Sequence, residues 1–481
     1  MTQQSIRRHK WPALMASSFG ALLSALTYGA VNVALPSLSK TFEVDFNVIQ
    51  WVMLSFLLAA GTVLPIVGRW ADMVGKKKLF LLGYGVFIAG SLLCGLATNV
   101  GLLIGFRIMQ GLGSASITAL GLAIITEAFP RHERGRAIGF NAAIISAGIV
   151  LGPSLGGLLV DMFTWRSIFI IVVPLGLLGS IFAQRFISPD RLVRKQNFDT
   201  FGAASLFIAL MLWSLGLTLG QDLGFASTLI VLLFIAGGFA MAAFLIIELR
   251  TVEPILDLRL FRKPVLGINL GVAFLTFMAI SAAVLMMPFY LENVLGHSPK
   301  NVGILMSVIP IFMVIVTPIA GLASDKFGEL PISLIGLTIL LFGYFSISTL
   351  SENTSAVGYL LRFLPIGLGM GIYETPNSSA IMGSVPREQS GVTGGLLSMT
   401  RTLGSSTGIA VLGTVWVARV HARTDSNVNT IITEASTSIQ VAALHDVLLV
   451  IQIMIVIALI LSFFLVINYS RNEAELNTKK L

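Results

Sequence analysis

Long apolar runs separated by short polar segments make up most of this chain. A helix that crosses a bilayer needs about 20 mostly apolar residues, and fourteen runs reach that length. They lie at residues 12–34, 47–67, 79–98, 101–126, 137–160, 166–185, 200–219, 227–247, 266–290, 301–323, 331–349, 357–380, 390–415 and 444–468. The pattern predicts an all-α integral membrane protein with 14 transmembrane helices and both termini on one side.

The composition supports this class and excludes several others. Of 481 residues, 55% are hydrophobic and 11% charged, whereas a soluble domain carries about 25% charged residues. The single cysteine, Cys94, rules out an intrachain disulfide. The chain has no GxxxxGK[ST] loop, no HExxH and no paired CxxC. We therefore expect neither an enzyme, nor an ATP-driven motor, nor a metal centre or other cofactor.

The basic residues divide unequally between the two sets of loops. Of the 31 lysines and arginines, only five fall in the second set: Lys40, Arg166, Lys300, Arg419 and Arg423. Three more lie inside spans: Arg107, Arg362 and Arg401. All others share the side of the termini. The positive-inside rule then predicts cytoplasmic termini, and we expect a multi-pass protein of a bacterial cytoplasmic membrane. The same topology explains the net charge of +8 without a nucleic-acid partner.

A charged loop with regularly spaced glycines lies between the second and third runs, at residues 68–78. It contains Gly68, Arg69, Asp72 and Gly75. Its Gly-Asp-Gly spacing returns 253 positions later, where Asp325 corresponds to Asp72. Glycine and aspartate also favour ordinary polar turns, and that simpler interpretation stays open.

Further pairs of motifs repeat at nearly the same interval. Arg107 precedes Gly111-Leu112-Gly113, and Arg362 precedes Gly367-Leu368-Gly369. Spans one to six thus resemble spans nine to fourteen in parallel orientation, a repeat found in transporters whose substrate site lies between two halves. We predict an N-terminal six-helix bundle at 1–198, two inserted helices with a linker at 199–264, and a C-terminal six-helix bundle at 265–481.

These motifs resemble the major facilitator superfamily. The 68–78 loop is similar to that superfamily's signature between spans two and three. The run from Gly148 to Gly157 resembles the motif of its antiporters, and Asn32-Val33-Ala34-Leu35-Pro36 resembles its fourteen-span drug:proton antiporters. The resemblance covers essentially the whole chain. It implies a major facilitator fold that works by rocking of two bundles.

The resemblance also implies a conformational gate. Gly68, Arg69, Asp72, Gly75 and Asp325 would form contacts that latch the outward-facing state and break as the cytoplasmic side opens. Charge-assisted contacts of Arg69 and Asp72 with neighbouring helix ends are physically reasonable. The alternative is that the lysines of this loop only fix the topology.

Glycines recur every four residues in the fifth span, at Gly148, Gly152 and Gly156, followed by Gly157. Such spacing places them on one helix face, where they let a neighbouring backbone approach. Pro153 removes a helical hydrogen bond and favours a bend. Packing alone can explain this stripe, while its resemblance to the antiporter motif favours export over uptake.

Glu374 is the one acidic residue well inside a predicted span. A charge at the bilayer centre costs roughly 2.5–3.5 kcal/mol, so we expect it to be functional. Arg401, one span later, falls at a comparable depth. We predict that Glu374 titrates protons or recognises cations and that Arg401 modulates it. A fixed structural ion pair, or a substrate-binding glutamate without a proton role, remains the alternative.

The first half lacks the acid that the resemblance leads us to expect. Arg107 resembles an arginine that many proton-coupled relatives require, yet Thr27 stands where a first-span aspartate is typical. Either coupling has moved to Glu374 in the second half, or the protein is not driven by that first-half site. Arg107 would then bind an anionic substrate group or form hydrogen bonds with backbone carbonyls. The predicted coupling and substrate residues are Glu374, Arg401, Arg107, Tyr373, Tyr28 and Asn32.

These features predict a proton-coupled exporter of small amphipathic or cationic compounds, with no catalytic residues. The expected partners are the small-molecule substrate and membrane lipid, with the proton gradient as driving force and a monomer as the working unit. One alternative is a dedicated exporter or importer of a single metabolite, lipid or siderophore. A non-transporting membrane sensor is the other, and charged residues inside spans argue against it.

Overall fold

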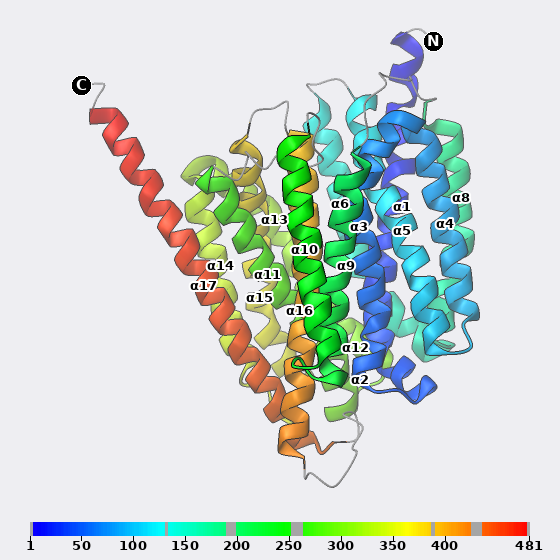
Figure 1. Ribbon diagram of the computed structural model, residues 1–481, viewed down its shortest axis with the longest axis vertical. Helices are drawn as coiled ribbons and strands as arrows, with labels where there is room; N and C mark the ends of the chain where they lie inside the picture. Colours follow the sequence, from blue (N-terminus) through cyan, green and yellow to red (C-terminus); the bar gives the residue numbers. More distant parts are fainter. Residues whose placement is uncertain are drawn as a thin grey trace.

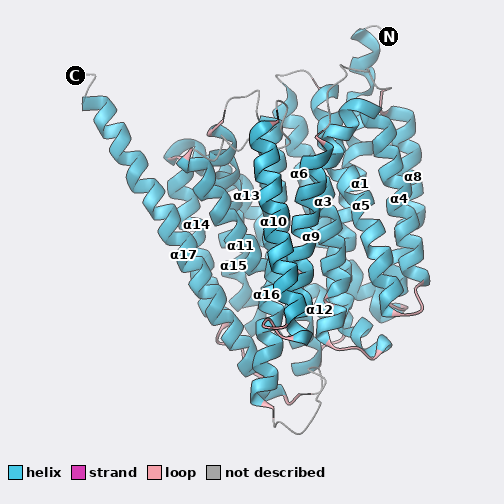
Figure 2. Ribbon diagram, viewed as in Figure 1, coloured by secondary structure: helices cyan, strands magenta, loops and turns pink. Residues whose placement is uncertain are grey.

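The computed structural model describes residues 3–129, 133–188, 199–251, 263–385, 390–424 and 435–478. Within these ranges the chain forms helices and connecting turns, and no strand (Figure 2). Fourteen helical segments in the described ranges are long and apolar enough to cross a membrane. The predicted fold class and the fourteen spans are thus confirmed. Both ends of the chain lie at one end of the molecule, here called the terminal side (Figure 1).

The helices of the first half are α1 (Gln3–Phe42), α2 (Phe46–Ile49), α3 (Trp51–Val74), α4 (Lys76–Leu96), α5 (Val100–Ala128), α6 (Arg134–Met162), α7 (Arg166–Ile170) and α8 (Val172–Phe186). Two further helices follow, α9 (Thr200–Leu223) and α10 (Thr228–Arg250). The second half comprises α11 (Pro264–Phe289), the π-helical turn η3 (Tyr290–Val294), α12 (Pro299–Met306), α13 (Val308–Phe327), α14 (Glu329–Ile347), α15 (Ala356–Gly383), α16 (Ser390–Arg423) and α17 (Thr437–Thr478).

Several helices extend beyond the predicted spans. α1 continues to Phe42, beyond the apolar run predicted at 12–34, and Pro36 lies inside this helix. α17 begins at Thr437, seven residues before the predicted start of its span at 444, and α16 continues to Arg423. Hydropathy locates the part of a helix that suits lipid, whereas helical hydrogen bonding continues through polar flanks.

The two halves use the same packing pattern, as the sequence repeat predicts. α6 lies against α1 so closely that a Cβ on Gly148 would come within 2.7 Å of the Leu22 carbonyl oxygen. α16 lies against α11 in the same way, and a Cβ on Gly404 would come within 2.6 Å of the Phe274 carbonyl oxygen. Helix pairs that approach this closely need glycine at the contact. Gly148 on α6 and Gly404 on α16 therefore hold the same place in two similar helix interfaces.

The repeated charged loop also has a repeated backbone geometry. Gly75 separates α3 from α4 with φ 109°, and Gly328 separates α13 from α14 with φ 89°. Each glycine N–H donates to a carbonyl four residues earlier, that of Ala71 and that of Ser324, at 2.9 Å. Positive φ is accessible to glycine at little cost and strains other residues. Glycine at these two positions is thus required by the turn itself.

α9 and α10 pack against each other and lie beside α3 and α16, in front of the seam between the two halves (Figure 1). Trp213 on α9 donates its indole N–H to the Phe234 carbonyl on α10 at 3.3 Å. This arrangement is compatible with two inserted helices. The exact boundaries at 198 and 264 stay predictions.

The two halves meet at the side away from the termini, here called the far side. Lys40 on α1 forms an ion pair with Glu292 on η3 at 2.7 Å. Ser154 on α6 and the Ser307 hydroxyl between α12 and α13 lie 2.7 Å apart. Phe46 packs edge-to-face on Trp416, with ring centroids 4.7 Å apart. Polar and aromatic contacts therefore join the halves near the far side.

Candidate functional site

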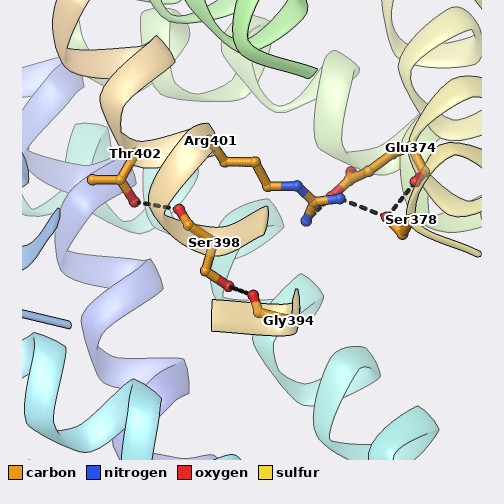
Figure 3. Close-up of polar contacts among 6 residues, drawn as sticks. All are labelled: Glu374, Ser378, Gly394, Ser398, Arg401 and Thr402. Atoms are coloured by element: carbon orange, nitrogen blue, oxygen red, sulfur yellow. Dashed lines mark hydrogen bonds and ion pairs between the residues drawn. The ribbon is translucent and has the colours of Figure 1, made fainter. Parts of the chain in front are cut away.

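Glu374 and Arg401 form an ion pair between α15 and α16. An Arg401 guanidinium nitrogen lies 2.9 Å from a Glu374 carboxylate oxygen; the Arg401 side chain is 25% exposed and that of Glu374 27%. Arg401 also donates to the Ser378 hydroxyl at 2.7 Å and lies over the Phe277 ring at 5.0 Å. Figure 3 shows Arg401 reaching across from α16 to Glu374 and Ser378 on α15.

The helices place this pair deep in the membrane-spanning region. Glu374 lies about nine residues, or roughly 14 Å, from the end of α15, and Arg401 lies at a similar distance from the start of α16. An ion pair removed from water stabilises a protein only when geometry and further hydrogen bonds offset desolvation. Here both groups retain about a quarter of their exposure, so proton or cation exchange at the carboxylate is sterically feasible. The sequence had predicted the common depth, and the structure brings the two residues into contact.

Arg107 has a different environment in the first half. It is fully buried, and its Nε donates to the Val52 carbonyl at 2.8 Å. A second guanidinium nitrogen donates to Gln110 at 2.5 Å, and Gln110 in turn donates to Ser91 at 2.7 Å. The guanidinium lies 4.2 Å from the Phe56 ring centroid. Of the alternatives open for Arg107, the structure shows the hydrogen bond to a backbone carbonyl.

Replacing Arg107 with lysine should therefore destabilise the protein although the charge is kept. One ammonium cannot stack on Phe56 and also make both hydrogen bonds of the guanidinium fork. We expect a loss of about 1.5–3 kcal/mol, which is the contribution of a buried hydrogen bond to a charged group. Thermal unfolding of the detergent-purified protein measures this.

The matched control is Arg362→Lys. Arg362 also makes two hydrogen bonds, to Thr349 and to the Gly358 carbonyl, but it lies near the far-side loops. Because Arg362 is only half-buried, its replacement should cost less than that of Arg107, about 1 kcal/mol or below. Equal losses for the two variants would show that burial does not set the contribution of Arg107.

The remaining predicted site residues fall into separate places. Tyr28 lies near Arg107 through Phe56, with ring centroids of Tyr28 and Phe56 6.4 Å apart. Thr27, at the position of the missing acid, is buried and donates to the Leu23 carbonyl of its own helix at 2.7 Å. Asn32 donates to the Val284 carbonyl on α11 at 3.0 Å, so it joins the two halves.

Tyr373 precedes Glu374 on α15 but is fully buried on the neighbouring face. α14 packs closely against the backbone of Tyr373, since a Cβ on Gly336 would lie 2.5 Å from the Tyr373 backbone nitrogen. The backbone of Tyr373 therefore belongs to the α14–α15 interface, while its side chain lies toward Thr276 on α11.

The predicted gate is described only in part. Gly68 and the side chains of Arg69 and Asp72 lie outside the described residues, although α3 passes through these positions. Asp325 is exposed on the last turn of α13, and within the described part of the chain it has no ion pair or hydrogen bond. Lys77 donates to the carbonyls of Gln184 and Ile187 at 2.7 and 2.5 Å. This lysine thus ties the start of α4 to the end of α8, and the latch role of Asp72 stays a prediction.

The glycine motif performs two structural tasks. Gly148, Gly152 and Gly156 face α1, where a Cβ on Gly152 would lie 2.9 Å from the Leu26 carbonyl oxygen. Gly157 faces the other half, and a Cβ there would collide with the Pro299 carbonyl at the start of α12. The carbonyl of Pro153 contacts Gly303 on α12 in the same way. The stripe therefore packs one bundle internally, and Gly157 and Pro153 close the far-side seam.

Sequence reasoning missed Ser378, Phe277 and Asn377. The first two contact Arg401, and Asn377 is buried on α15 with neither amide atom hydrogen-bonded within the described chain. A search for polar residues one turn from Glu374 would have found Ser378 and Asn377, because residues three and four apart are helix neighbours. Phe277 is one of many apolar residues in spans and carried no such signal.

Comparison with known proteins places this geometry in a family. The family model described as Major Facilitator Superfamily matches residues 17–409. The riboflavin transporter RibZ of Clostridioides difficile is 32% identical over 84% of this chain and 87% of its own. Multidrug resistance protein Stp of Mycobacterium tuberculosis is 32% identical over 85% of this chain and 76% of its own.

A solved structure shows the same fold. The inward-facing, unoccupied crystal structure of a bacterial homologue of the human lysosomal transporter Spinster superposes with a TM-score of 0.70. It is 17% identical and covers 95% of this chain and 96% of its own. With its fourteen spans, its repeated halves and these similarities, the chain belongs to the major facilitator superfamily of membrane transporters.

Proposed function

We propose that this transporter exports small amphipathic, preferentially cationic compounds in exchange for protons. The observation that carries the proposal is the partly exposed Glu374–Arg401 ion pair at 2.9 Å inside the spans. A carboxylate in that position is costly, and such residues in membrane proteins mark ion or substrate pathways. The names of two relatives agree with export of varied compounds: the multidrug resistance protein Stp and the multidrug transporter MdtP of Bacillus subtilis.

The proposed cycle uses a competition for the Glu374 carboxylate. When Glu374 is ionised it pairs with Arg401 or with a substrate cation, and when it is protonated it holds neither strongly. Following the positive-inside rule, we take the terminal side, which carries most of the basic loop residues, as the cytoplasmic side. The contacts at the far side then correspond to an inward-facing state, in which substrate enters from the cytoplasm. After rearrangement, a proton from outside neutralises Glu374 and releases the cation.

The proposal is tested in proteoliposomes with an acidic interior. We expect ethidium and tetraphenylphosphonium to accumulate inside as protons leave, and a protonophore to abolish the accumulation. The control is the same lipid vesicle without protein. If neither cation moves under any proton gradient, the proposed drug:proton exchange is wrong.

A dedicated carrier of one metabolite is the second candidate, and the similarity to a riboflavin transporter favours it. Riboflavin is uncharged and aromatic, so it would engage the site through stacking and hydrogen bonds rather than through an ion pair with Glu374. Transport of riboflavin in the same vesicles, without transport of either cation, would select this candidate.

A further inference from the structure

Three buried polar side chains of the second half have no hydrogen-bond partner in the described part of the chain. Asn377, one turn after Glu374 along α15, is 1% exposed, and both atoms of its amide group have no hydrogen-bond partner in the described chain. The hydroxyls of Ser333 on α14 and Ser462 on α17 are equally buried and equally without partners there. Leaving a buried polar group unsatisfied costs about 1–3 kcal/mol, so such groups in one place indicate a bound polar ligand.

The helix register puts Asn377 and Ser333 at one level. α14 and α15 are adjacent and antiparallel, and Gly336 on α14 lies against the backbone of Tyr373 on α15. Ser333 lies three residues before Gly336, and Asn377 lies four residues after Tyr373. Both displacements run toward the terminal side, so the two side chains occupy the same layer of the bundle.

Ser462 lies in this layer as well. Gln452 on α17 donates to the Tyr344 carbonyl on α14 at 3.1 Å, which fixes the register of these antiparallel helices. Ser462 follows Gln452 by about three turns, and Ser333 precedes Tyr344 by about three turns. Three helices thus each contribute one unsatisfied polar side chain to the same level.

The polar layer continues to the terminal side. Glu329 begins α14 one turn before Ser333 and accepts a hydrogen bond of 2.5 Å from the exposed Ser379 on α15. Glu374, at the other end, is three residues from Asn377 and therefore its neighbour on the helix surface. Glu374, Asn377, Ser333 and Glu329 thus follow one another from the level of the ion pair toward the terminal side, at spacings of three or four residues along α15 and α14.

We propose that Asn377, Ser333 and Ser462 bind ordered water, and that this water carries the proton of Glu374 to the cytoplasm while a bound cation covers the exposed part of the carboxylate; the proton step rests on the proposed function. Protonated Glu374 gives its proton to a water held by Asn377, and the proton leaves along Ser333 and Glu329 to bulk solvent. Glu374 remains as a carboxylate paired with Arg401. Asn377 is a positioning residue in this scheme because it orients the water without accepting the proton.

Stopped-flow measurement of ethidium-induced proton release from the purified protein tests the path. Asn377→Leu removes both polar atoms at similar volume and should slow proton release about tenfold, with the ethidium Kd changed less than about twofold. Asn377→Ser, which keeps a hydroxyl and leaves room for water, should recover a rate within about threefold of wild type. The matched control is Asn269→Leu on α11, since the amide of that buried residue already donates to the Val265 carbonyl at 2.9 Å.

Two results would overturn the path. In the first, Asn377→Leu releases protons at the wild-type rate. In the second, Asn377→Leu loses ethidium affinity, which would show that Asn377 binds substrate. If wild type releases no protons with ethidium, the proposed function fails, and the water site is decided separately. An experimental density map that resolves water should then show one within hydrogen-bond distance of the Asn377 amide and the Ser333 hydroxyl. A map that shows no water within hydrogen-bond distance of the Asn377 amide would overturn the water site itself.

Discussion

Glu374→Gln is expected to abolish gradient-driven ethidium accumulation, by at least about a hundredfold, which corresponds to ~2.7 kcal/mol. Glutamine keeps the shape of the side chain and can still accept a hydrogen bond from Arg401. It cannot bind or release a proton, and it cannot form the 2.9 Å ion pair. Accumulation in vesicles with an acidic interior measures the effect, and ethidium binding should survive with reduced affinity.

Two further variants separate a proton carrier from a structural ion pair. Glu374→Asp keeps the titratable group on a shorter stem and should retain part of the transport. Glu292→Gln removes a carboxylate that pairs with Lys40 at the far side, and it should transport nearly as wild type does. If Glu374→Gln still accumulates ethidium against the gradient, Glu374 has no coupling role and the pair is structural.

Gly157→Val is expected to shift the protein away from the state in which the far side is closed. A valine there would collide with the Pro299 carbonyl across the seam, while Gly156 next to it faces α1 within its own bundle. Overpacking a close contact typically costs about 1–3 kcal/mol, occasionally more, and a change of about 5.5 kcal/mol would turn a 99:1 population into 1:99. Transport should fall severely although the bundle still folds.

Cysteine labelling from outside measures this shift. The chain has one native cysteine, Cys94, which is fully buried, so a cysteine introduced at Ser154 is the main target. Ser154 contacts Ser307 in the closed seam. A membrane-impermeant maleimide should modify Ser154→Cys slowly in the wild-type background and quickly alongside Gly157→Val. Equal rates in both backgrounds would mean that Gly157 does not control closure.

The sequence was sufficient for the fold because lipid imposes a simple requirement. Every spanning segment must satisfy its own backbone, so long apolar runs become helices and their number fixes the topology. Repeats such as Gly75 and Gly328 could be matched because one turn needs positive φ at both positions. Helix ends such as Phe42 and Thr437 were less predictable, because hydropathy does not report where helical hydrogen bonding stops.

The site was predictable where the free-energy cost of a charge inside the membrane singled out a residue. Glu374 and Arg401 stood out because charges inside spans are expensive, and shared depth indicated that they meet. Arg107 stood out equally, but its partners are a backbone carbonyl, Gln110 and Phe56, which only packing reveals. Asn377 and Ser333 carry no charge, and small polar residues are common in spans, so only their burial without partners identifies them.

The central claim is that one carboxylate, Glu374, exchanges a proton for a cation. The most direct measurement is proton release at equilibrium when tetraphenylphosphonium binds the detergent-purified protein in weakly buffered solution, at a pH where the free protein holds the proton. We predict release from wild type in proportion to the cation bound and none from Glu374→Gln. Cation binding without proton release by wild type at every pH would contradict the account.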